Sequence, residues 1–275
     1  MLPRIGHIQY LNCLPLYYGM VKKGLLPNIE LRKGTPTELS NLLITGRLDI
    51  SPIPAIEYCR YSEDLLLLPH LTVSSDGEVK SILIASTVPI TELHGKPFAL
   101  PATSATSQVL ARIILEKKYG VKPVYFECPS DLPRMLLEAA AALLIGDDAL
   151  RTYVNSRNLF LYDLGREWKE LSGEKMVYAV WAARKEYAEN NREIVKELFQ
   201  AFMHSLRYSV DHIDEIAREI ARLESFTADF LKGYFLSLRF EFDTGYQEGY
   251  RTFLRHAQEM GFVQDIPELK FVEVE

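Results

Sequence analysis

Residues 29–53 read IELRKGTPTELSNLLITGRLDISPI, and they alternate two short β-type runs with one helical stretch. The TPTE segment at 35–38 predicts the start of a helix, because a threonine cap precedes a proline at the first helical position and a glutamate at the third. Leucines then recur at helical spacing, and Gly46 ends the pattern. A strand, a helix and a second strand joined by short links indicate a parallel α/β fold.

The same alternation extends on both sides of this stretch. Residues 4–10 predict a strand, 14–23 a short helix, and 54–61 the helix that follows the third strand. A second α/β series is predicted further along the chain, with strands at 98–100, 124–126 and 141–145 and helices at 107–119 and 131–139. From residue 190 onward the pattern changes to long amphipathic helical stretches at 193–223 and 228–260, before a strand-like tail at 270–274.

Two extended apolar runs bound the second series: KSILIAST at 80–87 and MVYAVWAA at 176–183. We interpret them as the segments in which the chain crosses from one lobe to another and back. The sequence therefore predicts a two-lobed α/β protein whose second lobe is inserted into the first, with the ligand cleft between them. Lobe one is predicted at residues 1–85 plus 182–275, including a helical C-terminal region, and lobe two at residues 86–181.

Composition limits the class of protein and of partner. A chain of 275 residues with 48% hydrophobic and 25% charged residues is typical of a globular protein and not of a disordered one. Lysines and arginines number 31 against 37 acidic residues, with no basic block, so nucleic acid and anionic membranes are poor partners. The three cysteines lack C-x-x-C spacing and the first residues lack a secretory signal pattern, so we expect a cytoplasmic protein without disulfides or structural zinc.

Motifs of cofactor and nucleophile chemistry do not occur in the sequence. It contains no H-E-x-x-H pair, no G-x-S-x-G elbow, no G-x-G-x-x-G and no Walker loop. We therefore expect neither a metal nor an organic cofactor. Among the histidines, His7 stands apart because it lies near the end of the first predicted strand beside Gly6, where a side chain can face a pocket.

Polar residues follow several predicted strands, at the sheet edge where α/β proteins bind ligands. Asn12 lies in the turn after the first strand, where it either faces a ligand or caps the helix that begins near Leu14. Ser51 begins a proline-stiffened segment, 51–54, and either points its hydroxyl into a cleft or belongs to a plain turn. Ser81, inside the first crossing run, faces either the cleft or the core.

The segment PATSATS at 101–107 predicts an anion site. Thr103, Ser104, Thr106 and Ser107 gather there at the start of a predicted helix, where one hydroxyl would suffice as a cap. Free backbone N–H groups, the positive end of the helix dipole and several hydroxyls together bind negative charge.

A further polar segment, 145–148, follows a buried strand. Asp148 is a candidate cap for the next helix, which leaves Gly146 and Asp147 as candidate pocket residues. From the residues alone, the chain is predicted to bind a small anion between two lobes. Whether it also carries out a reaction is left open by these spacings.

Five motifs occur in order along nearly the whole chain: GHIQYLNCLPL at 6–16, DGEVKS at 76–81, TSATS at 103–107, ECPSDL at 127–132 and LIGDDAL at 144–150. Together they resemble the chorismate dehydratases of the futalosine route to menaquinone. That family is similar in fold to type II periplasmic binding proteins, which agrees with the two-lobed prediction.

The resemblance implies a lyase that converts chorismate to 3-(1-carboxyvinyloxy)benzoate with loss of water and without a cofactor. The asparagine and the serine tied to activity in the family match Asn12 and Ser81. The helix start at 103–107 suits one of the two carboxylates of chorismate. The proton acceptor stays open between a substrate carboxylate, His7 and Asp147.

Two alternatives remain at this point. One is a non-catalytic protein that binds or senses a small dianion, because the fold is shared with solute-binding proteins. The other is the sister enzyme of the same route, 1,4-dihydroxy-6-naphthoate synthase, although the motif around Asn12 favours the dehydratase. The sequence leaves the oligomeric state open.

Overall fold

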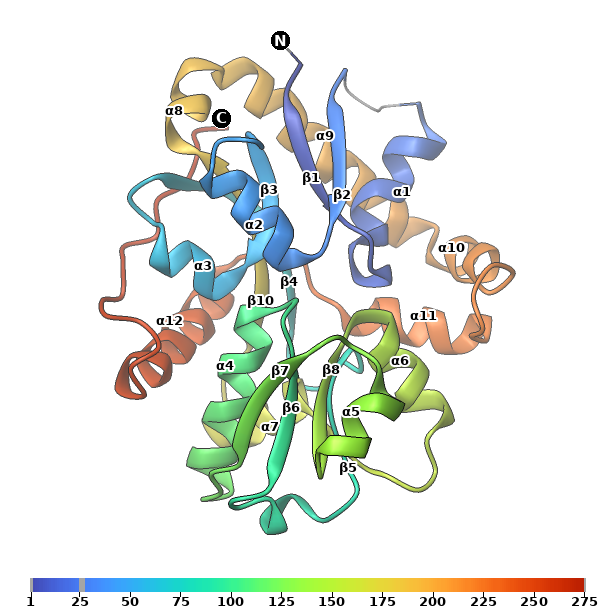
Figure 1. Ribbon diagram of the computed structural model, residues 1–275. Helices are drawn as coiled ribbons and strands as arrows, with labels where there is room; N and C mark the ends of the chain where they lie inside the picture. Colours follow the sequence, from blue (N-terminus) through green and yellow to red (C-terminus); the bar gives the residue numbers. More distant parts are fainter. Residues whose placement is uncertain (1, 25–27, 275) are drawn as a thin grey trace. The chain divides into compact units, whose positions relative to one another are not determined.

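The computed structural model describes residues 2–24 and 28–274, which fold into two compact units (Figure 1). The chain passes from unit 1 to unit 2 within the long strand β4 (Leu65–Ser75) and returns within β10 (Met176–Arg184). Each unit contains one five-stranded sheet. Unit 1 comprises Met1–Val73, Ala179–Phe240 and Pro267–Glu275, and unit 2 comprises Ser74–Tyr178 and Glu241–Ile266.

The sheet of unit 1 has the strand order β2-β1-β3-β10-β4. Its first three strands are β1 (Arg4–Ile8), β2 (Glu30–Gly34) and β3 (Ile50–Pro54). β1 pairs in parallel with β2 and β3, so the carboxyl ends of the three strands lie at the same edge. At the start of β1, the Arg4 guanidinium donates to both carboxylate oxygens of buried Asp49, at 2.6 and 3.0 Å, which joins β1 to the start of β3.

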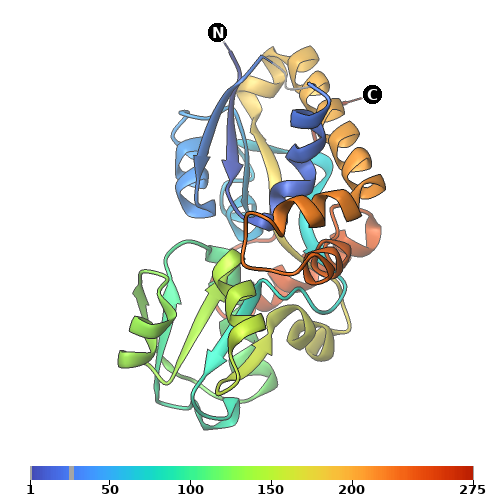
Figure 2. The ribbon, with the colours of Figure 1, turned by 90° about the vertical axis from the view of Figure 1, so that its right-hand side faces the viewer.

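Helix α2 of unit 1 begins as the sequence predicts. Thr35 Oγ1 accepts the N–H of Glu38, and the Glu38 carboxylate accepts the N–H of Thr35 at 2.9 Å, which is a complete capping box. Helices α1 and α9 lie side by side (Figure 2), and the N–H of Met20 donates to the buried hydroxyl of Ser205 at 3.1 Å. The helices of unit 1 are α1 (Leu14–Lys22), α2 (Pro36–Ile44), α3 (Ala55–Arg60), α8 (Lys185–Asn190), α9 (Arg192–Asp211), α10 (Ile213–Ile220) and α11 (Ala228–Ser237).

The sheet of unit 2 has the strand order β7-β6-β8-β5-β9. β6 is parallel to β7 and β8, whereas β5 is antiparallel to β8 and β9. The carboxyl ends of β6, β7, β8 and β9 and the start of β5 therefore lie at one edge, which we call the polar edge. The strands are β5 (Ile82–Ser86), β6 (Pro97–Pro101), β7 (Val124–Cys128), β8 (Ala141–Ile145) and β9 (Phe160–Asp163).

Four helices of unit 2 begin at the polar edge, because each follows shortly after a strand that ends there: α4 (Ala105–Ile113), α5 (Leu132–Glu138), α6 (Gly146–Asn155) and α7 (Leu164–Ser172). Unit 2 also contains α12 (Thr244–Glu259). Trp168 of α7 is fully buried, packs edge-on against Phe253 of α12 and donates to the carbonyl of Lys175 at 3.1 Å. This indole anchors α12 to unit 2.

The sequence predicts two long helical stretches, at 193–223 and 228–260, but each is divided into two helices in the structure. The first is divided at His212, whose backbone angles (φ −117°, ψ 23°) are not helical, and the second is divided between α11 and α12. Asp243 caps α12 by accepting the N–H of Tyr246 at 2.9 Å. The predicted strand at 270–274 is reduced, within the described residues, to an isolated bridge between Phe271 and Leu67.

The two units divide the chain differently from the predicted lobe boundaries. β5 lies within the sheet of unit 2 because it pairs with β8 and β9, so the run at 80–87 is not the first crossing segment. That segment is β4, for which the sequence analysis predicts no strand. α12 belongs to unit 2, although the C-terminal helices are predicted in lobe one. In residues 2–24 and 28–274, no helix combines the length and the apolar character that spanning a membrane requires.

Candidate functional site

Asn12 lies in the short 3₁₀ turn η1 (Leu11–Cys13) between β1 and α1. The N-cap of α1 is Cys13, and no side chain makes a capping hydrogen bond there, so the interpretation of Asn12 as a helix cap is wrong. Its Oδ1 atom is buried and has no hydrogen-bond partner in the part of the chain that the structure describes. A buried amide oxygen without a partner is unfavourable, so this atom is available to a ligand donor.

His7 lies on β1 with its ring against the edge of Tyr17, the ring centroids being 4.1 Å apart. Among the described residues, its buried Nδ1 atom has no hydrogen-bond partner. Burial, together with the positive charge of Lys33, lowers the pKa of His7 to about 4. The imidazole is therefore neutral at pH 7, where it can accept a proton.

Ser51 is a strand residue of β3, so the interpretation of 51–54 as a loop or turn is wrong. Its side chain is fully buried, and its hydroxyl donates to the carbonyl of Pro52 at 3.0 Å. A Cβ atom on Gly6 would lie 2.0 Å from Ser51 Oγ, so the glycine is what allows β1 to approach this side chain.

Gly6→Ala is expected to lower the free energy of unfolding by about 1–3 kcal/mol, as overpacking of a closed interior does. The new methyl group has no space, because Ser51 is fully buried between the strands. Urea denaturation measures the change. In the background of Ser51→Gly, which removes the clashing atoms, the same substitution should cost much less; an equal cost in both backgrounds would contradict the assigned contact.

The structure brings Ser81 and Gly146 together at the polar edge of unit 2. Gly146 donates its N–H to the carbonyl of Ser81 at 2.8 Å, where α6 begins beside the start of β5. The Ser81 hydroxyl lies 3.4 Å from the carbonyl oxygen of Val79, which is a long and weak hydrogen bond. A substrate atom can replace that bond at little cost.

The hydroxyl residues at 103–107 lie where α4 starts, at the same polar edge. Ser104 is the N-cap but makes no side-chain capping bond, and its hydroxyl lies instead 3.0 Å from that of Ser107. Thr103 Oγ1 is buried and, in the described chain, has no hydrogen-bond partner. Thr106 is fully buried. The starts of α4 and α6 direct positive dipole ends to this edge, which favours an anion.

The two aspartates after β8 differ in their surroundings. α6 begins at Gly146 with Ile145 as its N-cap, so the interpretation of Asp148 as a helix cap is wrong. Asp148 is exposed and lies 3.3 Å from the guanidinium of Arg151 and 3.1 Å from the hydroxyl of Ser130. Asp147 is half-buried in the first turn of α6, which is compatible with a role at the polar edge.

Asp163 is not among the site residues predicted from the sequence. It ends β9 and caps α7 by accepting the N–H of Arg166 at 3.0 Å. Its carboxylate also accepts the N–H groups of Val79 and Lys80, the two residues before Ser81. An aspartate between a strand and an amphipathic helix is a cap signal that the sequence does contain. Its hydrogen bonds with Val79 and Lys80, 84 and 83 residues away, cannot be predicted from any local sequence pattern.

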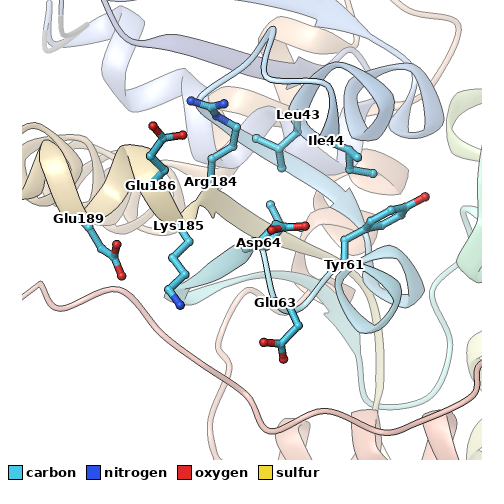
Figure 3. A pocket seen from close by; sticks show the side chains of 10 residues that line it. Leu43, Ile44, Tyr61, Glu63, Asp64, Arg184, Lys185, Glu186 and Glu189 are labelled. Atoms are coloured by element: carbon cyan, nitrogen blue, oxygen red, sulfur yellow. The ribbon is translucent and has the colours of Figure 1, made fainter.

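A pocket of about 550 Å³ lies elsewhere in unit 1 (Figure 3). None of the predicted site residues lines it. Four carboxylates and two cationic side chains line its walls, so the charge of the pocket disfavours a dianion. The charged lining residues are Glu63, Asp64, Glu186, Glu189, Arg184 and Lys185. In residues 2–24 and 28–274, no three His, Cys, Asp or Glu side chains are grouped to hold a metal ion.

Known proteins resemble this chain over most of its length. A chorismate dehydratase of Thermus thermophilus is 26% identical over 264 residues, which cover 90% of this chain and 93% of that protein. A chorismate dehydratase of Campylobacter jejuni is 27% identical over 178 residues, which cover 63% of this chain and 64% of that protein.

Among solved structures, the periplasmic aliphatic sulphonate binding protein SsuA of Escherichia coli is similar with a TM-score of 0.67 at 14% identity. The match covers 99% of this chain and 94% of that one. This likeness confirms the predicted α/β fold of the periplasmic-binding-protein type. The family model described as menaquinone biosynthesis matches residues 3–259, and the chain therefore belongs to this menaquinone-biosynthesis family.

Proposed function

We propose that the chain is a chorismate dehydratase, a hydro-lyase of the futalosine route to menaquinone that works in the cytoplasm. The curated relatives named for this activity and the menaquinone-biosynthesis family support the proposal. The observation that carries it is the Asn12 amide, which caps no helix and holds a buried oxygen without a partner among the described residues. The reaction turns chorismate into 3-(1-carboxyvinyloxy)benzoate and water.

The reaction removes the ring hydroxyl of chorismate and the hydrogen of a neighbouring ring carbon. The C–H electrons form the last ring double bond, the C–O electrons leave with the hydroxyl, and the released proton completes water. Because the product is aromatic, the driving force is large. The enzyme has to orient the substrate, stabilise the departing hydroxide and supply a proton acceptor.

Each group of site residues has a distinct proposed role. The helix start at 103–107 binds a substrate carboxylate through backbone N–H groups and the Thr103 hydroxyl. The Asn12 Nδ2–H group and the Ser81 hydroxyl donate hydrogen bonds as negative charge develops on the leaving group, because both are neutral donors and neither is a strong base. The buried Asn12 Oδ1 accepts a hydrogen bond from a donor group of the substrate. The proton acceptor is His7, Asp147 or a carboxylate of the substrate, and the pH–rate profiles of the parent, His7→Gln and Asp147→Asn together distinguish these groups.

We expect kcat/KM to stay flat between about pH 6 and 8, because a His7 whose pKa is about 4 is neutral throughout that range. The rate should fall as the pH approaches about 4, where the imidazole takes up a proton and no longer accepts one. A pH–rate profile measures this. A midpoint near the ordinary histidine value of 6.5 would contradict the buried, neutral state of His7.

The variant His7→Gln is the control for this profile. Loss of the low-pH limb together with most of the turnover assigns the proton acceptor to His7. A limb that is retained in His7→Gln assigns it to Asp147 or to the substrate carboxylate, and Asp147→Asn then separates these two.

The direct test of the function is incubation of the purified protein with chorismate, followed by chromatography of the aromatic product. We expect stoichiometric conversion without added metal or cofactor. Tight binding of chorismate without turnover would indicate a binding protein instead. Turnover of cyclic futalosine in place of chorismate would indicate the sister naphthoate synthase.

A further inference from the structure

The turn that leads into Ser81 has an unfavourable backbone conformation. Lys80, the residue directly before Ser81, has a φ of +62°, in the left-handed region that residues with a side chain rarely adopt. Such a conformation persists only where the surrounding structure holds it. The contacts that hold Lys80 therefore also determine where the Ser81 hydroxyl lies.

The carboxylate of Asp163 supplies these contacts. Its Oδ2 atom accepts the N–H of Lys80 at 2.5 Å, and its two oxygens accept the N–H of Val79 at 3.1 and 3.2 Å. The same group accepts the N–H of Arg166 and so caps α7. Asp163 is only 5% exposed, so burial raises the pKa of its carboxyl, an effect that the three backbone N–H groups oppose.

The start of α7 also packs directly against the preceding part of the turn. A Cβ atom on Gly165 would lie 2.2 Å from the carbonyl oxygen of Gly77, so the helix backbone touches the turn backbone at this point. The hydroxyl of Ser75 donates to the same carbonyl at 2.8 Å and lies 2.8 Å from the buried hydroxyl of Tyr178. The turn is thus held from both of its ends.

We propose that Asp163 is a positioning residue for Ser81: its carboxylate holds the N–H groups of Val79 and Lys80 and so fixes the left-handed turn that presents the Ser81 hydroxyl. The inference rests on the proposed catalytic role of Ser81. Asp163 acts through the backbone of the turn, whose next residue, Ser81, is joined to α6 by the N–H of Gly146.

The variant Asp163→Asn tests this role, because it keeps the size of the side chain but turns one acceptor oxygen into an NH₂ group that faces backbone N–H donors. We expect kcat to fall by about 10- to 100-fold, as a displaced catalytic group does, with KM almost unchanged. Asp163→Ser is a second variant that still caps α7 but is too short to reach Lys80, and it should behave in the same way.

The matched control is Asp243→Asn. Asp243 is also a helix-capping aspartate of unit 2, but it accepts the N–H of Tyr246, and within the described residues no hydrogen bond or ion pair joins it to the turn before Ser81. We expect this variant to keep its stability almost unchanged, because asparagine caps a helix about as well as aspartate, and kcat to stay within about twofold of the parent. If Asp243→Asn lowers kcat as much as Asp163→Asn does, the loss comes from changing any helix-capping aspartate and not from the contact with the turn. That result would overturn the proposal.

A double-mutant cycle with Ser81→Ala separates positioning from general destabilisation. If Asp163 acts through the Ser81 hydroxyl, Asp163→Asn should lower kcat far less in the Ser81→Ala background than in the parent. Equal losses in the two backgrounds would overturn the proposal. The amide protons of Val79 and Lys80 give a readout independent of activity, and in Asp163→Asn both should shift in the NMR spectrum and exchange faster with solvent.

These readouts distinguish failure of this inference from failure of the proposed function. If the parent protein leaves chorismate unchanged, the proposed function is wrong, whatever the NMR signals of the amides of Val79 and Lys80 show. If the parent converts chorismate and Asp163→Asn shows perturbed amides but native kcat, only the positioning role of Asp163 is wrong. Unperturbed amides in a folded Asp163→Asn protein would also overturn the role, because the carboxylate would then not hold the turn.

Discussion

Ser81→Ala is expected to lower kcat by about 10²–10³-fold, as loss of one preorganised hydrogen-bond donor does. The hydroxyl is buried at the polar edge of unit 2, and its contact with the carbonyl of Val79 is long. Removing it leaves no strong bond unsatisfied, so we expect the free energy of unfolding to change little. Steady-state kinetics with chorismate, together with urea denaturation, measures both quantities.

Thr103→Ala is the matched comparison from the same edge. Its hydroxyl is proposed to bind a substrate carboxylate, whose charge is the same in the ground state and in the transition state. The substitution should therefore raise KM and leave kcat almost unchanged. A Ser81→Ala enzyme with native kcat, or a Thr103→Ala enzyme that loses only kcat, would show that binding and chemistry are assigned to the wrong segments.

Local sequence signals predict much of the fold. The start of α2 can be predicted from the four adjacent residues 35–38, because a capping box requires no contact outside its own turn. The buried strand β8 lies at Ala141–Ile145, as predicted from its continuous apolar run. The polar segments of the site are also accessible from the sequence, since parallel strands place their carboxyl ends at one edge.

Other features depend on contacts between distant residues. β4 extends over eleven residues although it contains Pro69 and His70, the latter with a φ of +55°, and both interrupt a strand pattern. β5 lies in unit 2 because of its partners β8 and β9, which the sequence of β5 does not identify. For the same reason the predicted first crossing run, 80–87, lies one strand later than the observed one, β4.

In the candidate site, too, some features follow from the local sequence and others from contacts between residues far apart in the chain. Ser51 is separated from Gly6 by 45 positions, and only the pairing of β1 with β3 shows that the serine packs against the glycine. Asp163 is 83 residues away from Lys80, whose N–H it accepts. Residue type and strand-end position therefore identify the groups that can meet a ligand, whereas the groups that hold them in place emerge from the tertiary contacts.

Asn12→Ala is expected to lower kcat by about 10²–10³-fold without lowering stability. A helix-capping asparagine would show the opposite pattern, with a loss of about 1 kcal/mol in the free energy of unfolding and native turnover. The structure excludes the capping role, because Cys13 is the N-cap of α1 and no side chain caps that helix. Removing a buried amide whose oxygen has no partner among the described residues relieves a desolvation penalty, so the variant should be as stable as the parent or more stable.

Thr35→Ala is the control for this separation of activity from stability. Thr35 caps α2 in the same unit through a complete capping box, so its loss should cost about 1 kcal/mol of stability and leave kcat unchanged. Urea denaturation and steady-state turnover of both variants give the comparison. An Asn12→Ala protein that loses stability like Thr35→Ala and retains its turnover would show that the amide supports the fold. The expected result, a stable protein with little turnover, identifies Asn12 as a group kept unpaired in the fold so that it can bind the substrate.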